Sequence, residues 1–255
     1  MRAGGGLDKI TQTEYFLPLQ AERLHAEERK EEGIQMELSP KIREVVRYLG
    51  YHGVVPDEEV MREINDCIRD LQQVVTPRFV YERFPLSVRE EADAVPLICI
   101  EDIQVRSRNL AKNLEKCCGV YLMAVTLGPG PDRLIKRASV SSMSRAVIYQ
   151  AAAAAMTEEW CDRINERIRL EAEKDGLYLR PRYSPGYGDL PLEMQRDISR
   201  ILNMPKEIGV SLTQSLLMTP SKSVTALIGV SEEPGECRSK GCEECEAADN
   251  CMYRA

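Results

Sequence analysis

The stretch RYSPGYGDLP, at residues 182–191, follows a long helical run and constrains the fold more than any other segment of the chain. Pro185 fixes one backbone angle, and Gly186 and Gly188 can adopt the positive φ angles that other residues avoid. The two glycines also carry no Cβ atom that would obstruct a ligand approaching the main chain. The stretch therefore predicts a rigid turn with a bare backbone after the helical run.

Three side chains of the same stretch suit a small polar ligand. Arg182 presents a planar fork of donors that can bind a carboxylate through two hydrogen bonds. Tyr183 and Tyr187 each offer a flat apolar face with a polar tip. Two interpretations stay open, a plain surface loop and a ligand-binding loop, because proline next to glycine is first of all a turn signal.

The helical run before this stretch passes through the alanines at 151–155 and continues to Arg169, and its small residues let another element pack closely. Glu158 and Glu159 lie in its middle, beside the only tryptophan of the chain. Carboxylates at such positions usually face solvent. If Glu158 faces the loop instead, it can bind the α-amino group of a zwitterionic ligand whose α-carboxylate binds Arg182.

The composition narrows the class of protein. The chain has 255 residues, of which 43% are hydrophobic, and this is enough for the core of one large domain. A net charge of −7 argues against a nucleic-acid partner, since such a surface needs clustered Lys and Arg. No apolar run approaches the roughly 18 to 20 residues that cross a bilayer, and the first residues lack the apolar core of a signal peptide. We therefore expect a cytoplasmic protein with no membrane or nucleic-acid partner.

Charge and cysteine content divide the chain into three predicted parts. Residues 1–34 carry mixed charges and end near Gly33, a helix stop, so they predict an N-terminal extension. Residues 35–232 form the predicted main domain. Residues 233–255 form a predicted cysteine-rich tail.

Helical and strand patterns alternate along the main domain. Apolar periodicity and capping residues predict helices at residues 39–49, 57–75, 107–118 and 151–169 and a short helix from Pro191. Runs rich in β-branched and aromatic residues predict strands at 78–84, 95–101, 120–127, 207–213, 215–220 and 223–230. Because strands also occur in adjacent runs, this order favours an α+β domain with a largely antiparallel sheet.

Three segments resemble the activation domain of cobalamin-dependent methionine synthase, which binds S-adenosylmethionine. RYSPGY with Pro191 resembles its RxxxGY motif, and MTEEWCDRINERIR at 156–169 resembles its helix that ends in Glu-Arg-aliphatic-Arg. SLLMTPSKSV at 215–224 resembles its Met-x-Pro-x-x-Ser-Val segment. The resemblance covers roughly residues 35 to 230 and implies a twisted antiparallel sheet with surrounding helices.

The resemblance also implies a ligand site, with S-adenosylmethionine as the cofactor. It assigns Glu158 and Arg182 to the amino-acid end of the ligand, the backbone from Ser184 to Gly186 to the adenine or carboxylate, and Tyr187 to packing on the ligand. We expect Arg182 and Glu158 to face each other across a gap sized for one sulfonium amino acid. No catalytic residue is expected, because the protein would act by holding the methyl carbon over a cobalt ion.

The implied partner is a protein that carries cobalamin, either methionine synthase or a related corrinoid methyltransferase. In this family, reactivation couples a one-electron reduction of the cobalamin to methyl transfer from S-adenosylmethionine. A flavodoxin or ferredoxin would supply the electron. The homocysteine, folate and cobalamin modules have no counterpart in this sequence, so we expect that the chain does not make methionine by itself.

Two departures from the family bear on ligand affinity. The long methionine synthases have an Asp-Trp-Thr-Pro-Phe segment near the start of the domain, and nothing in this sequence matches it. They also carry a ligand-contacting tyrosine where this chain has Leu227 and Ile228. A scaffold that keeps the fold without the ligand is therefore an open alternative.

Four cysteines in the tail, Cys237, Cys242, Cys245 and Cys251, follow the pattern CX4CX2CX5C. In a reduced compartment, thiolates this close bind a metal more readily than they form disulfides. Zinc and a [4Fe-4S] cluster both accept four cysteine ligands, and both stay open, as do free or redox-active thiols. The tail gives an alternative function, an iron-sulfur or redox partner protein of a corrinoid enzyme that does not itself bind S-adenosylmethionine.

Overall fold

The computed structural model describes residues 38–51, 53–90 and 94–234. The predicted N-terminal extension at 1–34 lies outside these ranges, and so do the four tail cysteines Cys237, Cys242, Cys245 and Cys251. The division of the chain into three parts therefore stays a prediction. Within the described part of the chain, no helix combines the length and the hydrophobicity that a bilayer-crossing segment needs.

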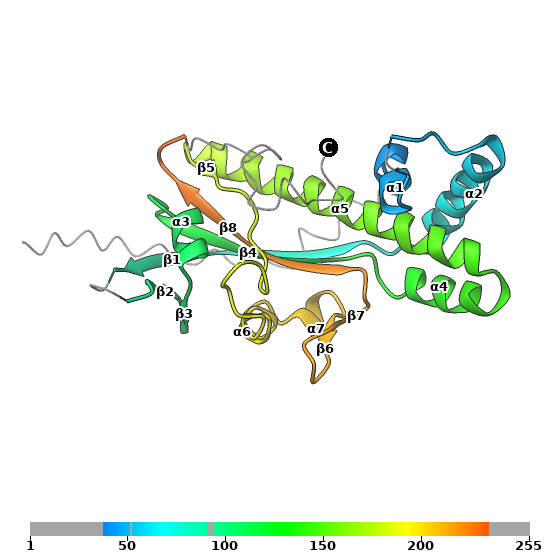
Figure 1. Ribbon diagram of the computed structural model, residues 1–255. Coiled ribbons are helices and arrows are strands. Elements are labelled where there is room, and N and C mark those ends of the chain that lie inside the picture. The colour runs from blue at the N-terminus through cyan, green and yellow to red at the C-terminus, as the bar shows by residue number, and fades with distance from the viewer. Residues whose placement is uncertain (1–37, 52, 91–93, 235–255) are drawn as a thin grey trace, which may run out of the picture.

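A six-stranded sheet forms the centre of the described structure (Figure 1). In spatial order its strands are β3 (Ile103–Arg106), β2 (Leu97–Ile100), β1 (Arg78–Arg89), β4 (Gly119–Thr126), β8 (Ser223–Ser231) and β5 (Tyr178–Leu179). Every pair of neighbouring strands is antiparallel. β1 belongs to both halves of the sheet, since its first part pairs with β4 and its last part pairs with β2. The predicted α+β class with an antiparallel sheet is confirmed.

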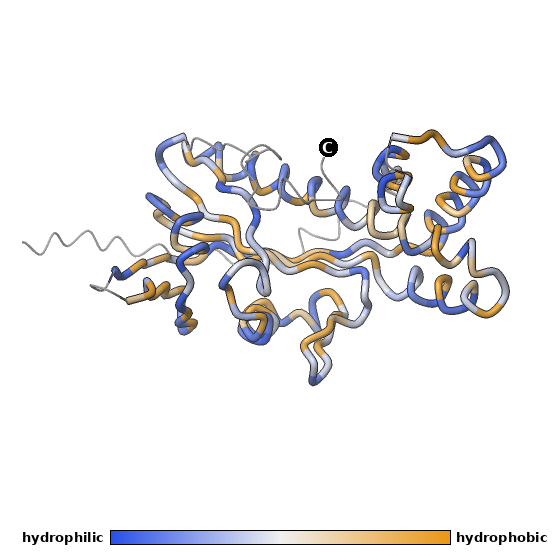
Figure 2. The backbone as a smooth tube through the Cα atoms, in the orientation of Figure 1, coloured by the Kyte–Doolittle hydropathy of each residue, from blue (hydrophilic) through white to orange (hydrophobic). Residues whose placement is uncertain are grey.

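Helices cover both faces of the sheet, so its central strands are buried on both sides. Met123 of β4 belongs to the core shared with α5 (Met143–Lys174), whereas Leu122 belongs to the core shared with α3 (Arg108–Asn113) and α6 (Met194–Ile201). In Figure 1, α5 runs along one face, and α6 and α7 (Met204–Glu207) lie on the other. Figure 2 shows hydrophobic residues along the central strands. A strand covered on both faces has a continuous apolar sequence, which is why residues 120–127 predict β4.

The predicted helices at 39–49 and 57–75 are confirmed as α1 (Ile42–Tyr48) and α2 (Glu58–Val74). The side chain of Asp57 accepts hydrogen bonds from two amides of the first turn of α2, and the hydroxyl of Ser107 accepts one from the amide of Leu110 in α3. The helical run before the loop is divided into two helices, α4 (Gly130–Ser141) and α5. The division occurs because Ser142 has an extended backbone with φ −158° and ψ 101°.

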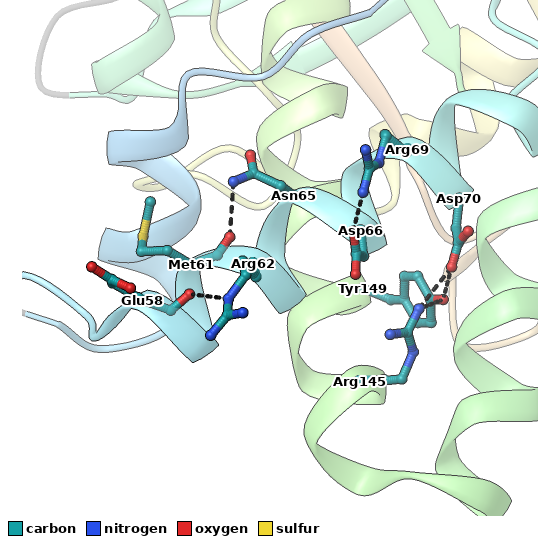
Figure 3. A network of polar contacts seen from close by, with 9 residues as sticks. All are labelled: Glu58, Met61, Arg62, Asn65, Asp66, Arg69, Asp70, Arg145 and Tyr149. Atoms are coloured by element: carbon teal, nitrogen blue, oxygen red, sulfur yellow. Dashed lines mark hydrogen bonds and ion pairs between the residues drawn. The ribbon is translucent and has the colours of Figure 1, made fainter.

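A polar cluster of Asp70, Arg145 and Tyr149 fixes α2 against α5 (Figure 3). The carboxylate of Asp70 accepts from Arg145 Nη2 at 2.7 Å and from the Tyr149 hydroxyl at 2.5 Å. Arg145 Nη2 also donates to the Tyr149 hydroxyl at 2.9 Å. Beside the cluster, α2 contributes the fully buried side chains of Ile64 and Leu71 to the core that it shares with α5.

The strands predicted at 207–213 and 215–220 are far shorter in the structure. They form a separate two-stranded sheet of β6 (Ser211–Leu212) and β7 (Met218–Thr219). Gly209 and Leu216 have positive φ angles of 71° and 65°, and such turns interrupt an extended backbone. The apolar residues Ile208 and Val210 are buried in the core between this segment and the main sheet rather than paired in strands.

Candidate functional site

Loop 182–191 connects β5 to α6 and has the turn geometry that its glycines predict. Gly186 and Gly188 have φ angles of 85° and 55°. The amide of Gly186 donates to the carbonyl of Leu190 at 3.0 Å, and the amide of Tyr187 donates to the carbonyl of Ser184 at 3.1 Å. These two amides therefore close the turn. A ligand that binds the Ser184–Gly186 backbone must use backbone groups other than the Gly186 amide.

Both ends of the loop are fastened to other elements. Tyr183 exchanges two backbone hydrogen bonds of 2.8 Å with Leu227 of β8. At the far end, the carboxylate of Asp189 accepts from the Ser107 hydroxyl and from the amides of Arg108 and Asn109, at the first turn of α3. Desolvation opposes the charged form of Asp189, but these hydrogen bonds outweigh it and lower the pKa of the carboxyl. The loop is thus held at a fixed position over the edge of the sheet.

Arg182 lies against two carboxylates of α5. Its Nη2 is 2.9 Å from Oδ1 of Asp162 and 3.7 Å from Oε2 of Glu158. Glu158 and Asp162 are four residues apart, so they lie on the same face of the helix. The side chain of Arg182 is 25% exposed, whereas those of Glu158 and Asp162 are 57% and 67% exposed. The structure therefore brings the two predicted residues Glu158 and Arg182 together.

The expected gap between Arg182 and Glu158 is absent from this arrangement. The two side chains stand in ion-pair contact, and Asp162 is the nearer of the two acidic partners of Arg182. The reason is electrostatic, since a guanidinium beside two carboxylates on one helix face closes onto them. An amino-acid ligand must enter between charges that are already paired with each other.

Two further side chains border the ion pairs. Burial raises the pKa of Tyr48, at the end of α1, and the charge of Glu158 raises it further. The Arg47 guanidinium lies 4.8 Å from the centroid of the Tyr48 ring. Cys161 is buried on the inner side of α5, and desolvation raises the pKa of its thiol to about 12 although the charge of Arg182 acts in the opposite direction. Tyr48 is thus a bordering aromatic residue, and Cys161 is a neutral thiol beneath the charges.

Tyr187 and Ser184 belong to the outer part of the loop. Tyr187 is 72% exposed, and its ring meets the ring of Tyr183 edge to face at a centroid distance of 5.9 Å. The hydroxyl of Tyr183 donates to the backbone carbonyl of Tyr187 at 3.2 Å. Ser184 is half-buried at the start of the turn. The contacts of Tyr187 are thus with the loop itself, whereas those of Arg182 are with α5.

Sequence reasoning missed Asp162, Tyr48 and Asp189. Asp162 could have been found from its spacing, because it follows Glu158 by one helical turn. Tyr48 and Asp189 carry no local signal, since their roles depend on how α1 packs on α5 and how the loop meets α3.

The metal prediction concerns residues beyond the described ranges. Among residues 38–51, 53–90 and 94–234, no group of three or more His, Cys, Asp or Glu side chains could hold a metal ion. The candidate ligands Cys237, Cys242, Cys245 and Cys251 all follow residue 234, so the prediction of a metal in the tail stays a prediction.

Comparison with known proteins gives two findings. The sequence model of the family described as "Vitamin B12 dependent methionine synthase, activation domain" matches residues 89–238, which is more than half of the chain. The fold is similar to that in a crystal structure of the MetH reactivation domain bound to AdoHcy, with a TM-score of 0.51 and 20% sequence identity. That match covers 68% of this chain and 64% of the other, which is less than two thirds of its length. No curated protein matches the chain.

Proposed function

The chain belongs to the family of vitamin B12-dependent methionine synthase activation domains, and on this premise we propose that it binds S-adenosylmethionine and supports reductive methylation of cobalamin held by a partner protein. The binding site consists of Glu158, Arg182, Ser184, Gly186 and Tyr187. The binding unit is the predicted domain at 35–232, between the extension at 1–34 and the tail at 233–255.

The observation that carries this proposal is the approach of Arg182 to Glu158. The two residues come from a loop and a helix, and their charged groups stand 3.7 Å apart. An α-amino acid needs one cationic and one anionic partner a few ångströms apart, because its carboxylate and ammonium groups lie on one carbon atom. Arg182 would bind the carboxylate of S-adenosylmethionine, and Glu158 would bind its ammonium group.

In this reaction the chain positions the methyl donor. S-adenosylmethionine carries a sulfonium, which is a good leaving group, so methyl transfer needs no general base. Cobalamin, when held by the partner, supplies the cobalt that accepts the methyl group. The clamp of Arg182 and Glu158 fixes the amino-acid end of the ligand, and Tyr187, which is exposed, would pack on the ligand. Holding two reactants in a reactive geometry is sufficient for a large rate increase.

The partner would be a cobalamin-binding methionine synthase or a related corrinoid methyltransferase in the cytoplasm. A flavodoxin or ferredoxin would reduce the cobalamin before the methyl group is transferred. The net charge of −7 supports a protein partner rather than nucleic acid.

Isothermal calorimetry with S-adenosylmethionine tests the binding step. We expect the wild-type protein to bind, and Arg182→Ala to lose at least about tenfold in affinity, because a charged hydrogen bond to the carboxylate is removed. Arg169→Ala is the matched control, since Arg169 lies on α5 but pairs with Glu166 and Glu173 of the same helix. Wild-type protein that shows no binding heat, or Arg182→Ala that binds as well as Arg169→Ala, contradicts the proposal.

A second experiment tests the role of the bound ligand. The chain is mixed with a candidate corrinoid protein, a reductant and S-adenosylmethionine labelled in its methyl group. Label that reaches the cobalamin only when the chain is present supports the proposal, and transfer that Arg182→Ala leaves unchanged contradicts it.

The four tail cysteines within fifteen residues support a second candidate, an iron-sulfur or redox partner protein of a corrinoid enzyme. Anaerobic purification followed by visible spectroscopy distinguishes a [4Fe-4S] cluster from bound zinc. An absorption band that dithionite bleaches favours a [4Fe-4S] cluster, and bound zinc without such a band excludes electron transfer through the tail.

A further inference from the structure

We infer that the turn between α4 and α5 is an interaction surface, and that its partner is a second copy of this chain. The inference goes beyond the proposed function and does not depend on it. It starts from two exposed surfaces of opposite charge on the helices α1, α2 and α4, which gather at one end of α5 (Figure 1). Each surface also has an apolar part.

The first of these, the basic surface, has its apolar part at the turn between α4 and α5. This part consists of the exposed side chains of Val140, Met143 and Val147, and Val140 is 89% exposed. Met143 follows Val140 by three residues, so their Cα atoms are at most about 11 Å apart, and Val147 lies about one helical turn further along α5. None of the three packs in either core of the described structure. Folding of one chain therefore leaves this apolar part in water.

Three cations of α4 adjoin this apolar part. They are Arg133, Lys136 and Arg137, and all three are exposed. They precede Val140 by seven, four and three residues, so they share one face of the helix with it. None of them forms an ion pair with a residue that the structure describes, whereas the next cation along the chain, Arg145, is neutralised by the carboxylate of the polar cluster in Figure 3. The basic surface therefore combines three available positive charges with exposed apolar side chains.

The second surface, the acidic surface, lies at the start of α2. Its apolar part is the exposed pair Val54 and Val55, of which Val55 is 86% exposed. The segment 57–63 follows directly and contains four carboxylates and one arginine. Glu58 and Glu59 in its first turn are exposed, and neither forms an ion pair within the described part of the chain. The acidic surface therefore has the pattern of the basic surface with the charge reversed.

The two surfaces are complementary in both of their parts. Apolar side chains that meet apolar side chains leave water, and cations that meet carboxylates gain attraction and a fixed register. Both halves of such a contact are present on this chain, and within one copy their charges do not pair with each other. The basic surface of one copy can therefore bind the acidic surface of the next, which is a heterologous contact.

The basic surface is also held rigid before any partner binds. Near the start of α4, the carboxylate of Asp132 accepts from the amide and the hydroxyl of Ser221 at 2.7 and 2.5 Å. Near the start of α5, Arg145 donates to the carboxylate of Asp70 at 2.7 Å. Both helices are thus fixed on either side of the turn. Docking orders little additional chain, so little conformational entropy is lost.

The test measures the mass of the wild-type protein by sedimentation equilibrium, with dithiothreitol present so that cysteines do not crosslink the copies. Between about 1 µM and about 1 mM, the range in which weak specific contacts dissociate, the average mass should rise above that of a single chain. Added salt should weaken this association. Lys136→Glu combined with Arg137→Glu should weaken it at least about tenfold, because like charges then face each other.

Mixing two variants makes the outcome specific to this pair of surfaces. Glu58→Lys combined with Glu59→Lys should weaken self-association by a similar factor. An equimolar mixture of the two double variants should associate again, because each variant then supplies the charge that the other needs. Arg196→Glu combined with Lys206→Glu is the matched control, since it reverses one arginine and one lysine on α6 and α7 and should associate like the wild-type protein.

The apolar part has its own variant, Val140→Ser, which should also weaken self-association. Because Val140 is exposed and packs in neither core, this variant should fold even if a charge reversal does not, as thermal denaturation of each variant shows. Self-association that Val140→Ser leaves unchanged overturns the inference.

Three other results overturn the inference while leaving the proposed function untouched. The first is wild-type protein that stays monomeric over the whole concentration range. The second is a mixture of the two folded double variants that stays monomeric. The third is monomeric wild-type protein that binds vesicles of anionic lipid, since the basic surface would then be a lipid contact. Failure to bind S-adenosylmethionine would count against the proposed function alone.

Discussion

The carboxylate of Asp189 accepts a hydrogen bond of 2.5 Å from the hydroxyl of Ser107, a residue 82 positions earlier in the chain. The amides of Arg108 and Asn109 donate to the same carboxylate at 2.7 and 3.1 Å. A carboxylate at this place satisfies amides that have no partner within the helix and interacts favourably with the helix dipole. The contact therefore links the end of loop 182–191 to α3, while Tyr183 links its start to β8.

Replacing Asp189 by Ala should release the end of the loop. We expect the free energy of unfolding to fall by about 1 to 2 kcal/mol, which is typical of a lost helix cap, as measured by urea denaturation. Limited proteolysis should also cut the loop faster in this variant. Asp57→Ala removes a comparable cap from α2 and serves as the control, since its stability should fall without faster cleavage of the loop. Equal cleavage rates in the two variants would contradict the anchoring role.

The same carboxylate should give a defined pH dependence. Hydrogen bonds lower the pKa of Asp189 in the folded protein despite desolvation, so the folded state binds this proton less readily than the unfolded state. Its contribution to stability is therefore complete above the unfolded pKa of about 3.9 and is lost as the pH falls through the lower folded value. The difference in unfolding free energy between wild type and Asp189→Asn should shrink below about pH 4. If the difference grows on acidification, the charged form of Asp189 does not stabilise the folded state as predicted.

The features that the sequence predicted are those with a local cause. Asp57 and Ser107 precede their helices directly, and Gly186 and Gly188 are the residues that a turn with positive φ requires. The buried strand β4 was also predictable, because burial on both faces leaves an unbroken apolar run.

The features that the sequence did not predict arise from contacts between distant elements. The bond of Asp189 to Ser107 and the position of Tyr48 near Glu158 depend on tertiary packing, for which a single sequence contains no signal. β6 and β7 are shorter than the strands that the sequence predicts, because Ile208 and Val210 fill a core instead of pairing in a strand. The sequence suggests Glu158 as the partner of Arg182, whereas the nearer carboxylate in the structure is that of Asp162.

Gly188 should be intolerant of any side chain. A Cβ atom at this position would stand 2.5 Å from Asn109 Nδ2 and 2.6 Å from the Tyr183 hydroxyl, and the backbone has a φ of 55°. Gly176→Ala is the matched control, because Gly176 also has a positive φ, of 71°, but has nothing within 4 Å of the added atom. We expect Gly176→Ala to cost about 1 to 2 kcal/mol from backbone strain alone, and Gly188→Ala to cost more. Chemical denaturation measures both, and equal losses would exclude a steric contribution.

Lys222 is a buried cation, since only 7% of the residue is exposed. Its Nζ donates to the carbonyl of Gln150 at 3.4 Å, which is a long hydrogen bond for an ammonium group. Desolvation lowers the pKa of Lys222, and the charge of Asp132 only partly opposes this effect. The charged form is therefore disfavoured in the folded protein relative to the unfolded chain.

Replacing Lys222 by Met should raise the free energy of unfolding at pH 7 by about 1 kcal/mol, because a side chain of similar length remains without the buried charge. The folded pKa lies below the unfolded value of about 10.4. The buried charge therefore destabilises the wild-type protein fully below the folded pKa, and this penalty disappears as the pH rises through the folded pKa. The difference between Lys222→Met and wild type should accordingly shrink between pH 7 and pH 10 in urea denaturation. Lys206→Met changes an exposed lysine and should show no such trend. If Lys222→Met is instead less stable than the wild-type protein at pH 7, the prediction is wrong. The ammonium group would then stabilise the loop that joins β7 to β8 by more than its burial costs.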